Sequence, residues 1–406
     1  MQKILNYKIT STVIWFLLLS FYIILSYLGN DIIIPSIFAS LSLYLFLIYS
    51  AIFIIFHFRD RISHLIIWEI VFLFLSFITM LYSPEFSILG GTFYMMIVNF
   101  VLVFVFSQMP WNEKWFKKTM NVFVFSCVSL IVLLFLTNNL YDESGRLGEN
   151  LFGNANILAT MLMVGAIYNL WMLFSCERKY KFVYFISVII IYLGMFLSGG
   201  RKYLVAPLIF LVFMVANDSK NDYKKVIKKI MLTLCISVFC FILIMKVPLF
   251  YNTIGYRFEG VFALFNDDFD VDGSTEKRMI MIVGGFEEFF NKPFFGHGFD
   301  SFKYFNRDFL TGNFYYSHNN YIELLFNYGI VGFLVYYGFY AYLFMKSIKL
   351  PKSVYKGFII GVIVCLLFYD FFAISYTSTP VHFLLFFCLE ITNIIDKKSQ
   401  SRTLEI

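Results

Sequence analysis

The sequence predicts an all-α, polytopic membrane protein with about 12 transmembrane helices. Of its 406 residues, 60% are hydrophobic and only 14% are charged, a composition far more apolar than that of a soluble domain. Apolar runs recur from residue 10 to residue 395. Each run is close to the roughly 20 residues that a helix needs to cross a bilayer. We therefore expect residues 1–406 to form a single membrane domain.

The expected spans follow the apolar runs in chain order and end at polar or basic residues. The first run, at 10–28, is long enough to cross the membrane, is followed at once by another, and lacks a small-residue cleavage site. It predicts a retained first helix rather than a signal peptide. The twelve expected spans are 10–28, 32–56, 64–82, 87–107, 119–137, 154–175, 182–198, 203–216, 230–248, 320–345, 357–373 and 379–395.

The placement of Lys and Arg predicts the topology. An even number of spans puts both termini on one side, and most of the 32 Lys and Arg residues fall in the loops on that side, including the run from Lys220 to Lys229. Because cytoplasmic loops are enriched in these residues, both termini are expected in the cytoplasm. The net charge of +6 is then a topology signal, and no nucleic-acid partner follows from it.

Arginine departs from this bias. Five arginines fall on the outer side: Arg146, Arg201, Arg257, Arg278 and Arg307. The guanidinium group binds phosphate through two parallel hydrogen bonds, so an outer group of arginines indicates an anionic ligand. We interpret Arg257 and Arg307 as solvated loop residues, and take the other three as candidate phosphate-binding residues.

Arg201 and Arg146 lie in short outer connections. Arg201 follows Gly199 and Gly200 in LSGGRKYLV, where the paired glycines allow a tight turn and a close approach to a ligand. Its alternative role is a snorkelling residue at the interface. Arg146 lies in ESGRLGENLFGNANILA, where the Gly and Asn residues equally fit an ordinary loop and helix cap.

The longest polar segment, about 249–319, is expected outside as a large extracytoplasmic loop. Within it, DGSTEKRMIMIVGGFEEFFNKPFFGHG predicts an amphipathic helix that lies on the membrane and ends before Pro293. Arg278 falls in the expected first turn of this helix, where the helix dipole also favours an anion. The alternative for Arg278 is a surface ion pair with Glu287 or Asp272, which would contribute little.

His318 lies where this segment re-enters the membrane, and it is the candidate catalytic base. Histidine is the side chain whose pKa lies nearest to neutral pH, so it is the usual general base. Asn319 could orient the imidazole or the acceptor, and Glu323 could be its partner or only close the first helical turn. A cap or interface role is the alternative for His318. We expect Gly329 and Gly332 to permit close helix packing.

These residues together resemble the signature of a known family. The stretch YYSHNNYIELLFNYGIVGF reads H-N-x9-G-x-x-G, and the chain order of Arg146, Arg201, Arg278 and His318 fits as well. The pattern is similar to that of the bacterial O-antigen ligase and polymerase superfamily of lipid-linked glycan transferases. The turn Pro293, Gly296, Gly298 also fits, whereas Gly200 replaces the Ser that usually precedes the arginine.

The resemblance implies a metal-independent, inverting glycosyltransferase that uses no cofactor. It would act at the outer leaflet of a bacterial plasma membrane on glycans linked to undecaprenyl pyrophosphate. His318, with Asn319 and Glu323, would be catalytic, and Arg201, Arg278 and Arg146 would bind the pyrophosphate. The lipid bilayer is the surrounding partner, and a flippase and a chain-length regulator are further candidate partners.

Three functions remain open within this expectation. The first is an O-antigen or capsule polysaccharide polymerase, and the second is a ligase that moves the glycan to lipid A core, a cell-wall polymer or protein. A glycan flippase is less favoured, because the polar groups gather at the outer face rather than at mid-membrane. A metal site is not expected: Asp268, Asp270 and Asp272 copy the start of an EF-hand loop, but Met279 stands at the twelfth position.

Overall fold

The computed structural model describes residues 2–57, 63–84, 86, 88, 91–137, 139, 146–217, 224, 227–228, 231, 241–248, 251, 255 and 273–403. Within these residues every named element is a helix, and one isolated bridge joins Gly29 to Ile34. In chain order the α-helices are α1 (Gln2–Leu28), α2 (Ile37–His57), α3 (His64–Met80), α4 (Gly91–Ser107), α5 (Glu113–Leu136), α6 (Glu149–Phe152), α7 (Ala155–Ser175), α8 (Lys181–Leu197), α9 (Arg201–Ala216), α13 (Gly273–Phe289), α14 (Phe302–Phe305), α15 (Asn320–Ile348), α16 (Val354–Asp370) and α17 (Thr379–Thr403). A 3₁₀ turn, η1 (Arg178–Tyr180), precedes α8, and a π-helical turn, η4 (Asn306–Leu310), follows α14.

Several helices are built to cross a membrane. In the described part of the chain, six are long and apolar enough to do so: α1, α2, α5, α7, α8 with η1, and α15; α3, α4 and α17 contain shorter apolar stretches. Large apolar side chains also remain on the outside of the bundle, with Ile55 75% and Phe182 73% exposed. Such surfaces are stable in lipid and not in water. The prediction of an all-α, polytopic membrane protein is therefore confirmed.

The observed helices follow the expected spans closely. Each expected span except the ninth coincides with a described helix, while the ninth, 230–248, lies largely outside the described residues. The second helix begins at Ile37 rather than at residue 32, because the Asn30 side chain accepts hydrogen bonds from the Ile32 and Ile33 N–H groups and holds a turn there. Asp31 completes this turn with a φ of 61°.

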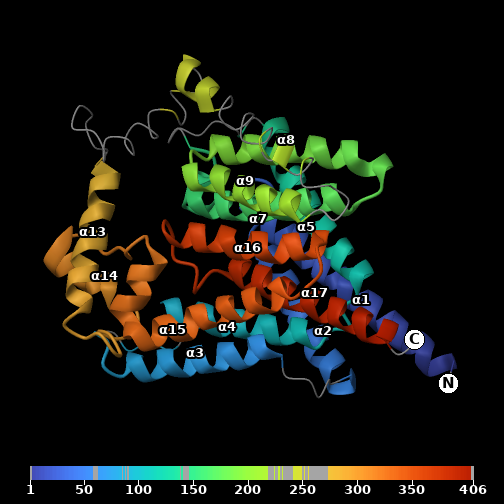
Figure 1. Ribbon diagram of the computed structural model, residues 1–406, viewed down its shortest axis with the longest axis horizontal. Coiled ribbons are helices and arrows are strands. Elements are labelled where there is room, and N and C mark those ends of the chain that lie inside the picture. Colours follow the sequence, from blue (N-terminus) through green and yellow to red (C-terminus); the bar gives the residue numbers. More distant parts are fainter. Residues whose placement is uncertain are drawn as a thin grey trace.

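The helices pack into one bundle with a transverse cap. Helix α9 lies along α16, α7 packs against α5 and α8, and α15 packs against α3 and α16. Figure 1 shows α13 and α14 at one end of the bundle, with α13 running across the direction of the long helices. The beginning of α1 and the end of α17 lie at the opposite end.

Helix α13 has the two faces expected of an interfacial helix. Met281 is 2% exposed and faces the protein, whereas Met279, Val283 and Phe286 are exposed. The spacing of the exposed apolar residues places them on one helical face, as in helices that lie in the membrane interface. Its buried face contacts α15, so α13 brings its polar residues to the start of that helix.

Candidate active site

A cavity of about 200 Å³ lies between α7, α9, α13 and α16, beside the start of α15. Its described lining contains two cationic side chains and one histidine, and no carboxylate, so the charge around it favours an anion. The lining residues are Asn154, Asn156, Ile157, Thr160, Met161, Lys202, Tyr203, Arg278, Tyr316, His318, Tyr369, Ala373, Ile374, Ser378 and Pro380.

His318 enters the cavity from the residue pair just before α15. Its backbone is in the left-handed region, with a φ of 57°, which is uncommon for residues other than glycine and is often found at functional sites. Its ring lies 4.3 Å from that of Tyr316, centroid to centroid. Burial, and then the nearby cations Arg278 and Lys202, lower the pKa of His318 to about 3. The imidazole is therefore neutral at pH 7 and keeps a lone pair that can accept a proton.

Arg278 reaches the same cavity from α13. Since α13 begins at Gly273, Arg278 lies in the second turn, and the prediction that it lies in the first turn is wrong. No carboxylate in the described ranges pairs with Arg278, so the alternative ion pair with Glu287 does not form. Asp272 lies outside the described residues. The guanidinium is thus available to a ligand in the cavity.

Lys202 is a cavity residue that the sequence pattern did not single out. It is the second residue of α9, and its ammonium donates a hydrogen bond to the Phe372 carbonyl at 2.7 Å. The same ammonium lies 4.9 Å from the Tyr203 ring centroid and 5.2 Å from that of Tyr369. The signal that could have identified it is its position next to Arg201 in the LSGGRKYLV turn.

Arg201 begins α9 but does not line the cavity. The turn before it is tight: Gly199 has a φ of 69°, and a Cβ on Gly200 would overlap the Tyr203 ring. Because Gly200 has no side chain, the Tyr203 ring in the first turn of α9 can pack directly against the backbone that precedes the helix. This geometry directs Lys202, rather than Arg201, into the cavity.

Arg146 lies next to the cavity and contacts one of its lining residues. Its Nε donates to the Ser198 carbonyl at 3.0 Å, and its Nη2 donates to the Asn156 side chain at 3.5 Å. Asn156 lines the cavity, whereas Arg146 does not. Arg146 thus contributes positive charge near the cavity and ties the loop before α6 to the end of α8.

Asn319 and Glu323 support the backbone around His318. The Asn319 side chain caps α15, accepting a hydrogen bond from the Ile322 N–H at 3.1 Å and donating to the Phe371 carbonyl at 3.3 Å. Glu323 is fully buried and accepts from the Ser317 N–H at 2.8 Å. Neither side chain lines the cavity. Their contacts position His318, and a direct catalytic role of either residue stays a prediction.

The turn that follows α13 fits into a kink in α15, and we call this contact the interlock. Gly329 interrupts the helix with φ 64° and ψ −166°, and the turn that follows α13 docks there. The Ile330 N–H donates to the Pro293 carbonyl at 2.8 Å, and the Gly298 N–H donates to the Asn327 carbonyl at 3.0 Å. The interlock fixes α13, and with it Arg278, relative to the helix that follows His318.

The two motif glycines therefore differ in role. A Cβ on Gly332 would overlap the Tyr328 side chain of α15 itself and would lie 3.4 Å from Leu75 of α3, so this position combines a contact within the helix with the expected helix packing. A Cβ on Gly329 would overlap the carbonyl group of Phe294. At this position the close approach is made by the turn, not by a neighbouring helix.

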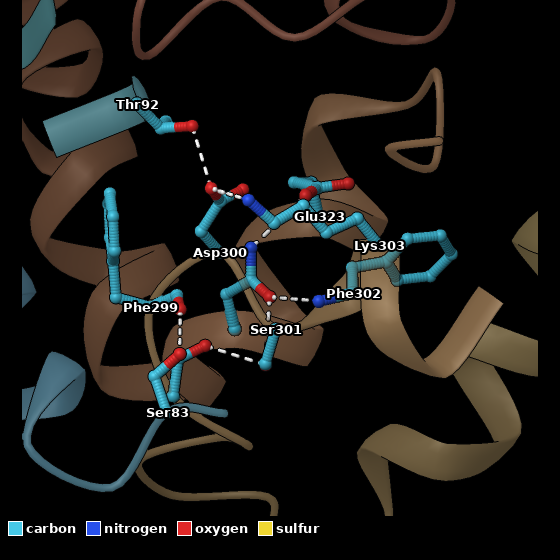
Figure 2. A network of polar contacts seen from close by, with 10 residues as sticks. Ser83, Thr92, Phe299, Asp300, Ser301, Phe302, Lys303 and Glu323 are labelled. Atoms are coloured by element: carbon cyan, nitrogen blue, oxygen red, sulfur yellow. Dashed lines mark hydrogen bonds and ion pairs between the residues drawn. The ribbon is translucent and has the colours of Figure 1, made fainter. Parts of the chain in front are cut away.

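A polar network extends the interlock to the rest of the bundle. Asn327 is fully buried; its Nδ2 donates to Glu323 Oε1 at 3.1 Å, and its Oδ1 accepts from the Phe302 N–H at 3.0 Å. Figure 2 shows the adjoining contacts, in which Thr92 and Lys303 both donate to Asp300 Oδ2, at 2.7 and 2.8 Å. The network links the His318 loop to the segment that carries α14.

The remaining predicted residues lie away from the cavity. Arg307 is on the surface, with its side chain 48% exposed and bound to Asp308, as expected of a loop residue. Arg257 and the acidic cluster Asp268, Asp270, Asp272 lie outside the described residues. No group of metal-binding side chains occurs in the described part of the chain.

The comparison with known families identifies the same region. Residues 185–337 match the Wzy_C family model, described as O-Antigen ligase, a class of membrane glycan transferases. The match runs from within α8 through α9, α13 and α14 into α15, and thus includes Arg201, Lys202, Arg278 and His318. It confirms the resemblance to the O-antigen ligase and polymerase superfamily. No curated protein matches the chain.

Proposed function

From the O-antigen ligase family segment at residues 185–337, we propose that this membrane protein is a polysaccharide polymerase. It transfers a growing glycan from undecaprenyl pyrophosphate to a hydroxyl of a new lipid-linked repeat unit, at the outer leaflet of a bacterial plasma membrane. Both termini are in the cytoplasm and the cavity faces outward in this proposal. The reaction inverts the anomeric centre and uses no metal.

One observation carries the proposal: a cavity lined by a neutral histidine and two cations, with no carboxylate among its described lining residues. A pyrophosphate leaving group departs readily once cations hold its charge. The acceptor hydroxyl needs a base close to the reacting carbon. His318 and Arg278 offer these two functions in one cavity.

The chemical step follows from these roles. The acceptor oxygen attacks the anomeric carbon of the donor glycan while His318 takes the hydroxyl proton. The bond between that carbon and the pyrophosphate oxygen breaks, and its electron pair leaves with undecaprenyl pyrophosphate. Arg278 binds the pyrophosphate as its negative charge increases. Arg146 supports this charge from behind Asn156, and Arg201 has the same proposed effect from the start of α9.

A ligase is the second candidate, because the matching family model is described as O-Antigen ligase. In a ligase the same cavity would pass the finished glycan to lipid A core, a cell-wall polymer or protein. The donor half of the reaction is identical in both functions. The identity of the acceptor therefore distinguishes the two.

The test replaces His318 and, separately, Arg278 with Ala in a cell that makes the cognate polysaccharide. Arg307→Ala is the matched control, because Arg307 is an outer arginine bound to Asp308 outside the cavity. Membrane levels are checked, and the glycans are separated on a gel. A polymerase predicts that each cavity variant loses the ladder and accumulates single lipid-linked repeats outside.

Other outcomes contradict this proposal in different ways. A ladder that persists on undecaprenyl carrier without reaching its final acceptor would identify a ligase. Repeat units trapped on the cytoplasmic side would indicate a flippase. Unchanged glycans in both variants would show that the cavity is not the active site.

A further inference from the structure

Two cations from different helices meet at the cavity. Arg278 comes from α13 and Lys202 from the start of α9. Both lower the pKa of His318 through their charge, so both lie within electrostatic reach of the proposed base. In the described part of the chain neither forms an ion pair with a carboxylate. Burial, and then the charges of Arg278 and Arg146, lower the pKa of Lys202 to about 7. A multivalent anion bound beside Lys202 and Arg278 would therefore favour the charged ammonium.

The Lys202 side chain is held in place for such a ligand. Its ammonium lies over the rings of Tyr203 and Tyr369, and cation–π contacts stabilise a cation where water is partly excluded. Of the three N–H donors of an ammonium, one binds the Phe372 carbonyl. The aromatic rings are not hydrogen-bond acceptors of comparable strength. Donors of Lys202 therefore remain for a ligand oxygen.

We propose that Lys202 binds the second phosphate of a lipid diphosphate while Arg278 binds the first, so that the pair selects diphosphate carriers over monophosphate carriers. This inference rests on the proposed function, and it assigns a substrate contact to Lys202, which is not among the phosphate-binding residues predicted from the sequence. A compact ammonium suits a single phosphate oxygen, whereas a guanidinium binds two. The two groups thus complement each other across one diphosphate.

Lys202 also contributes to catalysis. When the glycan leaves, the diphosphate gains the electron pair of the broken bond, so its contact with Lys202 strengthens in the transition state. The bound anion also offsets the positive charge near His318. The base is therefore more effective with the donor bound than in the empty cavity.

The experiment measures binding of the purified full chain to undecaprenyl pyrophosphate and to undecaprenyl monophosphate in detergent. Lys202→Gln is compared with wild type and with Lys277→Gln, an exposed lysine beside Arg278 that does not line the cavity. For Lys202→Gln we expect diphosphate affinity to fall about tenfold or more, the loss of one charge-assisted hydrogen bond. Affinity for the monophosphate should change less, and Lys277→Gln should bind both like wild type.

A second variant tests the same contact if Lys202→Gln does not fold. If Lys202→Gln does not remain folded in detergent, Lys202→Met takes its place with the same expectation, because its apolar stem can still cover the Tyr203 and Tyr369 rings. Lys202→Arg keeps the charge and should retain most of the preference for diphosphate.

The possible failures separate the two proposals. If Lys202→Gln or Lys202→Met keeps the wild-type preference while Arg278→Gln loses diphosphate binding, the role of Lys202 is wrong and the proposed function stands. An equal loss for both carriers would also overturn the selection of diphosphate. If neither cation affects binding, the cavity is not the anion site and the proposed function fails with it.

Discussion

Replacing Gly329 with Ala tests whether the interlock between α13 and α15 positions the site. Gly329 has φ 64° and ψ −166°, a conformation essentially restricted to glycine. A side chain there costs about 1–3 kcal/mol in backbone strain. The added Cβ would also overlap the Phe294 carbonyl and lie 2.7 Å from the Phe295 nitrogen. Backbone atoms cannot rotate away, so the turn has to move.

The displacement adds to the strain. It would break the hydrogen bonds from the Ile330 and Val331 N–H groups to the Pro293 and Phe294 carbonyls, which contribute about 0.5–1.5 kcal/mol each. Together the strain and the lost bonds amount to roughly 2–6 kcal/mol, a large part of a typical folding free energy. The turn carries α13, so Arg278 would also move away from His318.

The assay combines the apparent melting temperature of the purified protein in detergent with the glycan ladder in cells. Gly338→Ala is the control: Gly338 lies in the same helix, and its added Cβ meets no atom within 4 Å. Alanine in a helix interior is favoured over glycine by roughly 0.5–1 kcal/mol, so this control should be as stable as wild type and active. A Gly329→Ala protein with wild-type melting temperature and a complete ladder would refute the positioning role of the interlock.

Further predictions concern the pH profile and the buried network. Because burial lowers the pKa of His318 to about 3, the base remains neutral as pH falls through 6.5, and kcat/KM should be nearly flat down to about pH 5; a fall centred at 6.5 would contradict this. The lowered pKa of His318 means that the unfolded chain binds a proton at this residue more readily than the folded protein does, so His318 destabilises the folded state increasingly as pH falls from 6.5 toward 3. The melting temperature of His318→Gln should therefore fall less than that of the wild type over this pH range. Arg278→Gln removes a nearby positive charge and should shift the acid limb of the residual activity to higher pH, whereas no shift would mean that the charge of Arg278 does not act on His318. Asn327→Leu leaves Glu323 Oε1 and the Phe302 N–H without their hydrogen-bond partner, and each unsatisfied buried group costs about 1–3 kcal/mol of stability. The variant should have a lower melting temperature and a lower kcat. An unchanged kcat would exclude a role of Asn327 in positioning the site.

Much of the fold could be predicted from local sequence, because a membrane span is defined by the length and polarity of one continuous segment. The span expected at 154–175 is helix α7 at Ala155–Ser175, and the turn expected at Pro293 follows α13. Helix starts depend on more than the local apolar pattern. Helix α13 begins at Gly273, which moves Arg278 out of the first turn, because the end of a helix depends on caps and contacts as well as on its pattern.

Which side chains line the cavity depends on tertiary structure and cannot be predicted from their order along the chain. Successive helical residues point about 100° apart, so whether Arg201 or Lys202 faces the cavity depends on how α9 packs, and the structure directs Lys202 inward. Glycine at 329 was evident in the sequence, but its partner is a turn more than thirty residues earlier. The sequence by itself determined the membrane class and singled out the candidate arginines and the histidine before α15. The tertiary structure decided which cation meets His318 and what holds them together, because those contacts join segments far apart in the chain.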